Sequence, residues 1–327
     1  MKRAVFAVGL AAVLVVACVV VAVAFREPAT SAALREWRAL APAGLERTEV
    51  AAARIGRHLY VVGGFEKRSG ETVGALERYD TKADRWKRLR SMPVGANHPT
   101  AAAYRGKLYV HGGYTARRDL ASATNRLYVY DPKRDRWSRL ADSREARAAH
   151  AVGVIAGRLY AVGGRNEAGD LASMEVYNFL KRRWSRGPSL RGPRRDHMAG
   201  VASGGYFYAL AGREGARNYT VAERYDPRKR RWERLPPMRR ARGGIASAAL
   251  SGGRVVVFGG EDFGTGKTIS EVELYDPRKR RWRYLPDMRT PRHGLGGVSK
   301  GNRVYSIQGG PQPGFHFAST IEFLDVR

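Results

Sequence analysis

A repeated eight-residue segment constrains the fold of this chain more than any other feature. The segment YDPRKRRW occupies residues 225–232 and recurs, letter for letter, at residues 275–282. Weaker copies occupy residues 79–86, 130–137 and 177–184. A period of about 50 residues is typical of repeat architectures, in which each unit buries its apolar face against its neighbours.

Two further landmarks keep the same period. Pairs of glycines begin at Gly63, Gly112, Gly163, Gly259 and Gly309. In the fourth unit, Ala211–Gly212 takes the place of the pair. One tryptophan accompanies each unit: Trp37, Trp86, Trp137, Trp184, Trp232 and Trp282. Glycine permits close backbone approach and a positive φ where a strand ends, and tryptophan supplies a large packing surface. The landmarks therefore define six units.

Each unit has the pattern of short β-strands. In the third unit, residues 149–155, 159–162 and 174–177 are apolar runs separated by turn signals, and Trp184 opens a fourth run. The first run is rich in small residues, which suits an inner strand crowded near an axis. Strands of this length and spacing indicate an all-β propeller or barrel.

On these residues the chain resembles the kelch-repeat family from residue 35 to residue 327. The resemblance implies an all-β, six-bladed kelch β-propeller of four-stranded blades. The blades are expected at residues 48–89, 98–140, 148–190, 196–235, 243–285 and 293–326. The last unit has no tryptophan after its glycines, so residues 36–40 are predicted to supply its outer strand and close the ring. Residues 36–327 then form one propeller domain.

The N-terminus predicts a membrane anchor. Residues 4–25 are apolar and uncharged after Lys2 and Arg3, and a run of this length spans roughly 30 Å as a helix. We expect residues 1–25 to be a signal-anchor transmembrane helix and residues 26–35 a linker, with the propeller outside the cytoplasm in the cell envelope. A cleaved signal, giving a secreted protein, and lipidation of Cys18 remain alternatives. Cys18 is the only cysteine, so no disulfide is expected in the propeller.

The charge is strongly basic, with 59 Lys and Arg against 30 Asp and Glu, a net charge of +29. Either surface composition or a polyanionic partner explains such a balance. In a four-stranded blade, the turns between strands 3 and 4 lie on one face, here called the bottom face. The loops between strands 2 and 3 and the blade connections lie on the opposite, top face. The basic YDPRKRRW-type turns therefore ring the bottom face, where we expect an anionic membrane surface. Nucleic acid is disfavoured, because the predicted location is outside the cytoplasm.

Arginines recur on the top face, 16 or 17 residues before five of the Gly pairs: Arg47, Arg147, Arg195, Arg242 and Arg292. Arg165 and Arg213 join them from loops between strands 2 and 3. In kelch propellers that bind proteins, arginines at such positions line the pocket for acidic peptides, and the resemblance implies that role here. Guanidinium suits a bidentate grip on carboxylate. The chain is interpreted as a monomeric binding module for an acidic protein or anionic ligand, without a cofactor.

An enzyme is the alternative function. Sialic acid mutarotases of the bacterial envelope are six-bladed kelch proteins, and the resemblance implies a possible sugar epimerase or mutarotase. Such an enzyme needs an acid–base group within reach of its substrate, and six top-face acids are candidates: Glu49, Glu66, Glu167, Asp196, Glu214 and Glu261. No single acid stands out, so no catalytic residue is assigned. A narrow pocket with a carboxylate beside an arginine would favour the mutarotase, and an open arginine-lined bowl the binding module.

Metal chemistry finds less support in the sequence. A copper centre of the galactose oxidase type needs a cysteine crosslinked to tyrosine, and Cys18 lies in the apolar run. Four histidines stand near the starts of inner strands: His98, His150, His197 and His293. Their distances from the Gly pairs are unequal, so we expect polar residues at loop ends rather than ligands that converge on one ion.

Overall fold

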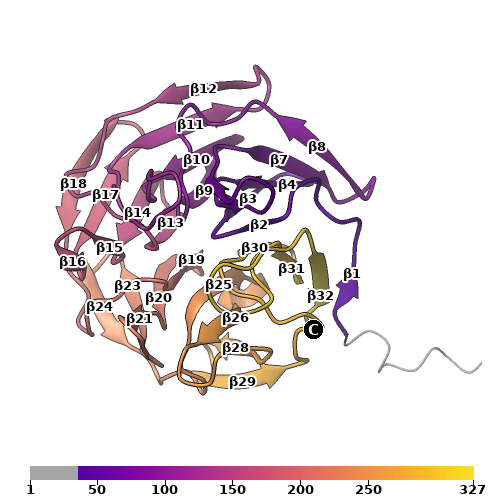
Figure 1. The fold of residues 1–327 in the computed structure, drawn as a ribbon. Coiled ribbons are helices and arrows are strands. Elements are labelled where there is room, and N and C mark those ends of the chain that lie inside the picture. Colours follow the sequence, from indigo (N-terminus) through magenta and orange to yellow (C-terminus); the bar gives the residue numbers. More distant parts are fainter. Residues whose placement is uncertain (1–35) are drawn as a thin grey trace, which may run out of the picture. The chain divides into compact units, whose positions relative to one another are not determined.

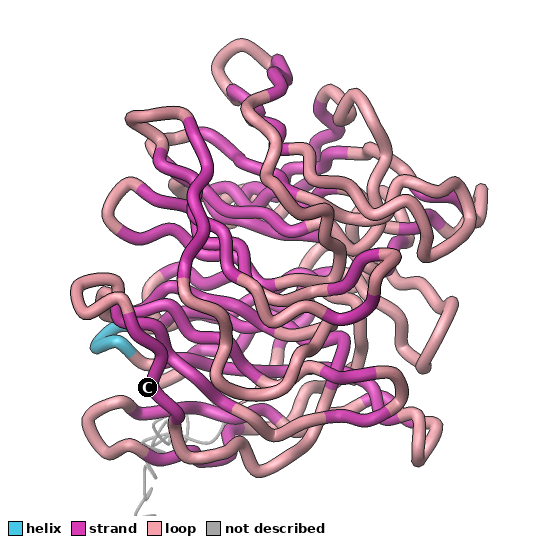
Figure 2. Tube along the Cα trace, turned by 90° about the vertical axis from the view of Figure 1, so that its left-hand side faces the viewer, coloured by secondary structure: helices cyan, strands magenta, loops and turns pink. Residues whose placement is uncertain are grey.

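The fold is a ring of six β-sheets around a central axis (Figure 1). The computed structural model describes residues 36–327, which belong to one compact unit. Each sheet is a blade in which four antiparallel strands follow one another from the axis outwards. The all-β, six-bladed propeller predicted from the repeats is therefore confirmed. The side view in Figure 2 shows strands and loops throughout, with a single 3-10 turn, η1 (Ser251–Gly253).

The strands take equivalent places in all six blades. The innermost strands are β3 (Ala51–Ile55), β9 (Thr100–Tyr104), β13 (Ala151–Ile155), β19 (Ala199–Ser203), β25 (Gly243–Ala249) and β30 (Gly296–Lys300). The second strands are β4 (His58–Val62), β10 (Lys107–His111), β14 (Arg158–Val162), β20 (Tyr206–Leu210), β26 (Val255–Asp262) and β31 (Arg303–Ile307).

The outer half of each blade is equally regular. The third strands are β7 (Leu76–Asp80), β11 (Leu127–Asp131), β17 (Met174–Asn178), β23 (Ala222–Asp226), β28 (Val272–Asp276) and β32 (Ile321–Asp325). The fourth strands are β8 (Arg85–Leu89), β12 (Arg136–Arg139), β18 (Arg183–Gly187), β24 (Arg231–Arg234), β29 (Arg281–Leu285) and β1 (Arg38–Ala39). Short two-residue strands lie at the top face: β2 (Arg47–Thr48), β5 (Phe65–Glu66), β6 (Glu71–Thr72), β15 (Arg165–Asn166), β16 (Gly169–Asp170), β21 (Arg213–Glu214), β22 (Arg217–Asn218) and β27 (Lys267–Thr268).

Small residues on the inner strands let six sheets converge on one axis. A Cβ added to Gly200 would lie 2.4 Å from the Cβ of Ala151 in the preceding blade. A Cβ added to Gly297 would lie 2.6 Å from that of Ala246. Real side-chain atoms do not approach so closely, so larger residues here would force the blades apart. Farther from the axis the gap widens, and apolar clusters built from adjacent blades fill it.

The repeated tryptophans join each blade to the one before it. Every indole Nε1 donates a hydrogen bond to a backbone carbonyl that follows the fourth strand of the preceding blade. Trp86, for example, donates to Ala41 O at 2.8 Å. In the first five blades the indole ring also packs on the tyrosine opposite it, as Trp86 does on Tyr79 at 5.2 Å between ring centroids, whereas Trp37 packs on Phe258. The spacing of the tryptophans thus records the spacing of the blades.

The ring closes where the sequence predicted. β1 pairs with β32 as the outer strand of the last blade, with Arg38 opposite Phe323. Trp37 is buried and donates to Pro286 O at 3.1 Å, in the same manner as the other five tryptophans. Because β1 and β32 come from opposite ends of the described chain, their pairing in this blade closes the ring.

The glycine pairs end the second strands with a positive φ, and in the sixth blade the predicted pair is one residue out of register. In the first blade, φ is 72° at Gly63 and 91° at Gly64. The equivalent residues of the sixth blade are Gln308 (φ 55°) and Gly309 (φ 98°), not Gly309 and Gly310. The N–H of the second residue donates to the next blade in all six cases, from Gly64 to Ala96 O and, across the closure, from Gly309 to Arg47 O. A carbonyl 2.4–2.9 Å from the missing Cβ leaves room only for glycine at this second position.

The predicted anchor and linker, residues 1–25 and 26–35, lie outside the described residues. Within residues 36–327 there is no helix with the length and hydrophobicity that a membrane crossing requires.

Trp37 provides a test of the closure. We expect Trp37→Ala to lower the free energy of unfolding by about 3–5 kcal/mol, because a buried indole is lost from the closing blade. Trp37→Phe should cost less, since it keeps an aromatic ring and removes the hydrogen bond to Pro286, worth about 1 kcal/mol. Urea denaturation measures both. Equal, small losses for the two variants would show that the ring does not depend on this strand.

Candidate functional site

The five arginines predicted to line a top-face pocket are buried in the blades instead. Arg47, Arg147, Arg195, Arg242 and Arg292 each have a relative exposure of 0%. Each guanidinium pairs with a glutamate on the third strand of its own blade, at 2.9–3.4 Å: Glu77, Glu175, Glu223, Glu273 and Glu322. The arginines also donate to backbone carbonyls at the end of the second strand, as Arg47 does to Gly63 O at 2.8 Å.

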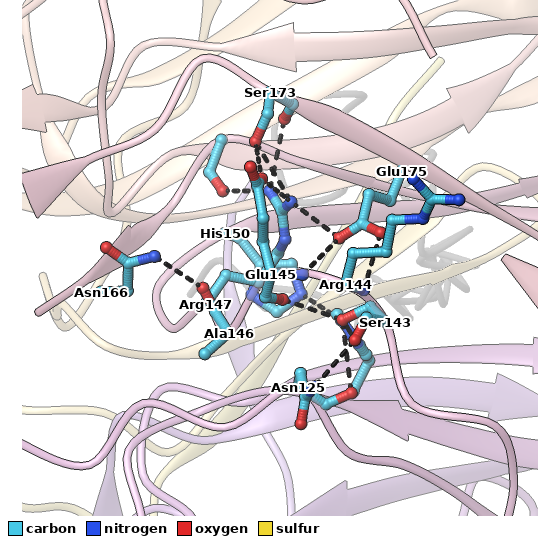
Figure 3. A network of polar contacts seen from close by, with 12 residues as sticks. Asn125, Ser143, Arg144, Glu145, Ala146, Arg147, His150, Asn166, Ser173 and Glu175 are labelled. Carbon is cyan, nitrogen blue, oxygen red and sulfur yellow. Dashed lines mark hydrogen bonds and ion pairs between the residues drawn. The ribbon is translucent and has the colours of Figure 1, made fainter. Parts of the chain in front are cut away.

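Three of the glutamates complete this network by accepting hydrogen bonds from the connection that enters their own blade: Glu175, Glu223 and Glu273. Figure 3 shows it in the third blade, where Glu175 accepts hydrogen bonds from Arg144 N and Glu145 N at 2.9 and 3.1 Å. Arg147 bonds Glu145, Glu175 and Ser173 in the same network. Each buried pair therefore links the second strand, the third strand and a blade connection at a site that excludes solvent.

The second blade shows that arginine and glutamate occur as a unit. Ala96 takes the place of the arginine and Tyr128 the place of the glutamate, and the two are buried in one apolar cluster. Sequence reasoning noted the arginines but missed their partners, which follow 28–31 residues later. This nearly constant spacing, and the absence of both residues from the same unit, are the sequence signals from which the pairs could have been predicted.

Burial lowers the pKa of Arg47 and of Arg292 to about 10, and both stay charged at neutral pH beside their glutamates. Arg165, on a top-face loop, is 45% exposed and pairs with Asp170 at 3.0 Å. Ligand binding by the seven arginines stays a prediction, and the burial of five of them does not favour it.

The structural role of the buried pairs can be tested with Arg195. Arg195→Ala leaves Glu223 charged in a site without solvent, so we expect a loss of about 3–5 kcal/mol in the free energy of unfolding. The double variant Arg195→Ala/Glu223→Tyr copies the second blade and should recover much of that stability. Chemical denaturation at pH 7 measures both. A stable single variant that fails to bind a partner would instead favour the ligand-binding role.

Six residues form a ring around the axis, one from each blade. Each of them follows the buried arginine, or Ala96 in the second blade, by two positions in the sequence. All six adopt a left-handed backbone, with φ between 48° and 68°: Glu49, His98, Ala149, His197, Gly244 and Gly294. Backbone hydrogen bonds join neighbours in this ring, as from His98 N to Glu49 O and from Gly294 N to Gly244 O. A positive φ is costly for residues other than glycine and concentrates at functional sites. The ring lines an axial channel of about 400 Å³ at the end where the inner strands begin.

Polar side chains gather at this end of the channel; we call them the mouth cluster: Glu49, His98, Asp196, His197, Arg213, Glu261 and His293. Oε2 of Glu49 lies 2.9 Å from Nε2 of His98, and Oε1 lies 3.2 Å from Nδ1 of His293. Arg213 pairs with Glu261 at 2.5 Å and lies 3.9 Å from Asp196. All seven are buried or nearly so.

Electrostatic coupling favours the ionised form of two carboxyl groups in this cluster, those of Glu49 and Asp196. Burial raises the pKa of Glu49, but His98 and His293 outweigh it and hold the pKa well below its usual range. Burial likewise opposes ionisation of Asp196, yet His197 and Arg213 lower its pKa. Burial lowers the pKa of His98. For His293, burial acts in the same direction, but Glu49 and Glu261 leave the pKa raised. The result is a set of carboxylates and bases fixed within hydrogen-bonding distance.

The structure thus divides the three groups of predicted residues. Of the seven arginines, Arg213 alone reaches the mouth cluster. Of the six candidate acids, Glu49, Asp196 and Glu261 belong to it, whereas Glu66, Glu167 and Glu214 bond to loop residues. Of the four histidines, three converge on Glu49 and Asp196, contrary to the expectation that they would not meet. Glu49, His98 and His197 each stand 14 residues before the first residue of their pair, a shared spacing that could have found them.

His150 takes a different place, in a buried histidine pair. Its Nε2 lies 2.9 Å from Nδ1 of His111 and 2.8 Å from Oγ1 of Thr100, and Nε2 of His111 lies 3.0 Å from Oγ of Ser143. Burial and the charge of Arg147 lower the pKa of His111 to about 3, and burial holds the pKa of His150 well below its ordinary value. Both imidazoles are therefore neutral in the folded protein.

This pair predicts acid sensitivity. Its contribution to stability is present above the unfolded pKa of about 6.5 and is lost as pH falls, because only the unfolded chain takes up the protons. His111 alone should cost roughly 2 kcal/mol at pH 5. Denaturation at pH 7.5 and pH 5 should show a smaller loss for His111→Gln than for the wild type. Ser143→Ala keeps both imidazoles and should retain the full loss; equal losses in all three proteins would exclude the histidine pair as the cause.

The loops around the mouth cluster expose apolar side chains. Leu120, Phe263 and Phe315 are 49%, 43% and 50% exposed, and each lies on a loop between strands 2 and 3. The rings of Phe315 and Phe65 pack in a tilted arrangement with their centroids 4.6 Å apart, and Phe263 lies under the guanidinium of Arg213 at 4.7 Å. The top face therefore combines an apolar rim with a buried polar centre.

Comparisons with known proteins agree with this architecture. A family model described as the KLHDC2/KLHL20/DRC7 Kelch-repeats domain matches residues 31–189 and 142–310. Alpha-scruin of Limulus polyphemus is 37% identical over 135 residues, 39% of this chain and 14% of that protein. Kelch-like protein 26 of Homo sapiens is 39% identical over 124 residues, 38% of this chain and 20% of that protein. The matched region therefore spans a fifth or less of these curated relatives.

A solved structure, that of YjhT, superposes on 88% of this chain and 97% of its own, with a TM-score of 0.77. At 17% sequence identity, this likeness shows the fold alone.

Proposed function

This chain belongs to the kelch-repeat family, and from that premise we propose that it is a binding module that takes an acidic protein partner on its top face. The observation that carries the proposal is the apolar rim of the top face. Phe263 lies against Arg213 of the mouth cluster, Phe315 packs on Phe65 beside His98, and Leu120 is exposed on a further top-face loop. Exposed aromatic side chains beside arginine are the residue types that dominate binding energy at protein interfaces. Loops held on a rigid scaffold are also where binding residues concentrate.

The charge of the top-face loops supports an acidic partner. Arg117 and Arg118 are 75% and 65% exposed, and the side chain of Lys67 is 59% exposed. Their neighbours Glu71 and Glu46 neutralise part of this charge, yet the chain as a whole carries +29. Complementary charge at the rim of an interface accelerates association and sets the salt dependence.

The test compares partner recovery by the wild type and by Phe263→Ala/Phe315→Ala. We expect the double variant to recover its partner at least tenfold less well, because two anchors are removed from the rim. Leu180→Ala is the matched control, since Leu180 is 90% exposed on a bottom-face turn. Affinity capture from the source membranes followed by titration of the purified partner measures the effect. Equal recovery by all three proteins, with release by moderate salt alone, would leave net charge as the only basis of binding.

A carbohydrate epimerase is the second candidate. The observation that favours it is Arg213 beside Asp196 and Glu261 at the channel mouth, the combination of arginine and carboxylate expected above for such an enzyme. Exchange of sugar anomers, followed by NMR with the same purified protein, separates the candidates: acceleration that Arg213→Ala abolishes would favour the enzyme.

The same proposal extends to the setting of the propeller. The turns between strands 3 and 4 expose Lys82, Lys133 and residues 181–183, 228–231 and 278–281 on the bottom face. Such a basic ring supports contact with anionic headgroups, at about 1 kcal/mol per residue near the surface. The membrane anchor and the extracytoplasmic location remain proposals from the sequence.

A further inference from the structure

We infer that Glu49, His98 and His197 form a binding site for one divalent transition-metal ion of the zinc type. One oxygen or nitrogen from each side chain lies within 4.8 Å of the others. Two imidazoles and one carboxylate are a ligand set that binds Zn²⁺ and, in other geometries, Fe²⁺. Ligand bonds of about 2.0–2.2 Å require only that these side chains rotate towards a shared centre.

The backbone brings the three ligands together by symmetry. All three occupy the same position in their blades, in the ring of left-handed residues around the axis. The other ring residues are Ala149, Gly244 and Gly294, which carry no ligand atom and leave space beside the three. A Cβ at Gly294, in the neighbouring blade, would lie 2.4 Å from Oε1 of Glu49, so a larger residue there would displace the carboxylate.

Each ligand is oriented by a second residue, which is the arrangement that metal sites share. Nδ1 of His98 lies 2.7 Å from Oδ1 of Asn97, and Nδ1 of His197 lies 2.9 Å from Oδ1 of Asp196. Nε2 of His98 faces Oε2 of Glu49, and His197 offers a ring nitrogen within 4.8 Å of both other ligands. Oε1 of Glu49 lies 3.2 Å from Nδ1 of His293, and Oε2 lies 2.9 Å from Nε2 of His98.

These orienting residues also follow the repeat. Asn97, Asp196 and His293 each stand one position before a ring residue. Three ring positions thus supply ligands and three preceding positions supply their supports. If these residues formed only an ion-pair cluster, His98 and His293 would suffice to pair with the carboxylate of Glu49. Such a cluster would not require His197 to lie within 4.8 Å of both Glu49 and His98. Three protein ligands leave a fourth position for water or another ligand, as in catalytic zinc sites.

The experiment measures Zn²⁺ binding by the full chain after removal of metal with a chelator. We expect one Zn²⁺ per chain by elemental analysis, and a melting temperature that rises with Zn²⁺ concentration because only the folded ring assembles the ligands. His197→Gln and Glu49→Gln should weaken binding at least 100-fold. Asp196→Asn, which keeps all three ligands, should weaken it 10- to 100-fold. His150→Gln is the matched control, a buried channel histidine outside the cluster, and should bind Zn²⁺ as the wild type does.

X-ray absorption of the Zn²⁺-loaded wild type does not depend on any variant folding. Two imidazoles with oxygen ligands and no sulfur from Cys18 would support the site. Absence of stoichiometric Zn²⁺ binding by the folded wild type would overturn the inference, as would sulfur ligation or unchanged affinity in both ligand variants.

Discussion

The buried ion pair between arginine and glutamate is the interaction on which the rest of this propeller depends. A charge removed from water is costly unless it is paired and its remaining hydrogen-bonding groups are satisfied. Here the guanidinium meets both a carboxylate and backbone carbonyls, and the carboxylate, as at Glu223, accepts hydrogen bonds from backbone N–H groups of the connection that enters its own blade. The pair therefore specifies one path for three segments that are distant in sequence. In the second blade, Ala96 and Tyr128 replace charge by apolar packing, which shows that the fold needs the space filled and satisfied rather than charged.

The buried ion pair also sets the position of the candidate functional residues in the ring around the axis. Each ring residue stands two positions after a buried arginine or its replacement, so the pair fixes where the backbone turns into the inner strand. The carbonyl of Arg195 accepts a hydrogen bond from Gly164 of the preceding blade, and His197 then enters the channel in a left-handed conformation. Contacts with the neighbouring blades stabilise this strained conformation, as in the hydrogen bond from Gly244 N to His197 O. A ring of equivalent positions can therefore hold Glu49, His98 and His197 close together although about 150 residues separate the first from the last.

The two faces of the ring are distinct in chemistry. The bottom face carries short, exposed, basic turns whose Asp or Asn side chains accept backbone N–H bonds, as Asp226 does from Arg228. These turns are built for the strand connection itself. The top face carries longer loops of varied sequence, with an apolar rim over a buried polar centre. Because the scaffold does not depend on the loop tips, they are free to specify a partner, and the mouth cluster beneath them offers chemistry that a packing core does not need.

The sequence by itself determined the repeat, the strand pattern and the closing strand, because Trp and Gly landmarks reflect contacts made identically in every blade. It also placed Glu49, His98, His197 and Arg213 near the top of the ring. It misplaced the glycine pair of the last blade, since Gln308 adopts a conformation that composition does not reveal. The tertiary structure alone decided which polar residues are buried supports and which meet at the axis. Arg147 and Arg213 are both top-face arginines in the sequence, but Arg147 pairs with a glutamate of its own blade and Arg213 with Glu261 of the next blade, in the mouth cluster. That difference arises from packing between blades, which brings together residues that no local pattern relates.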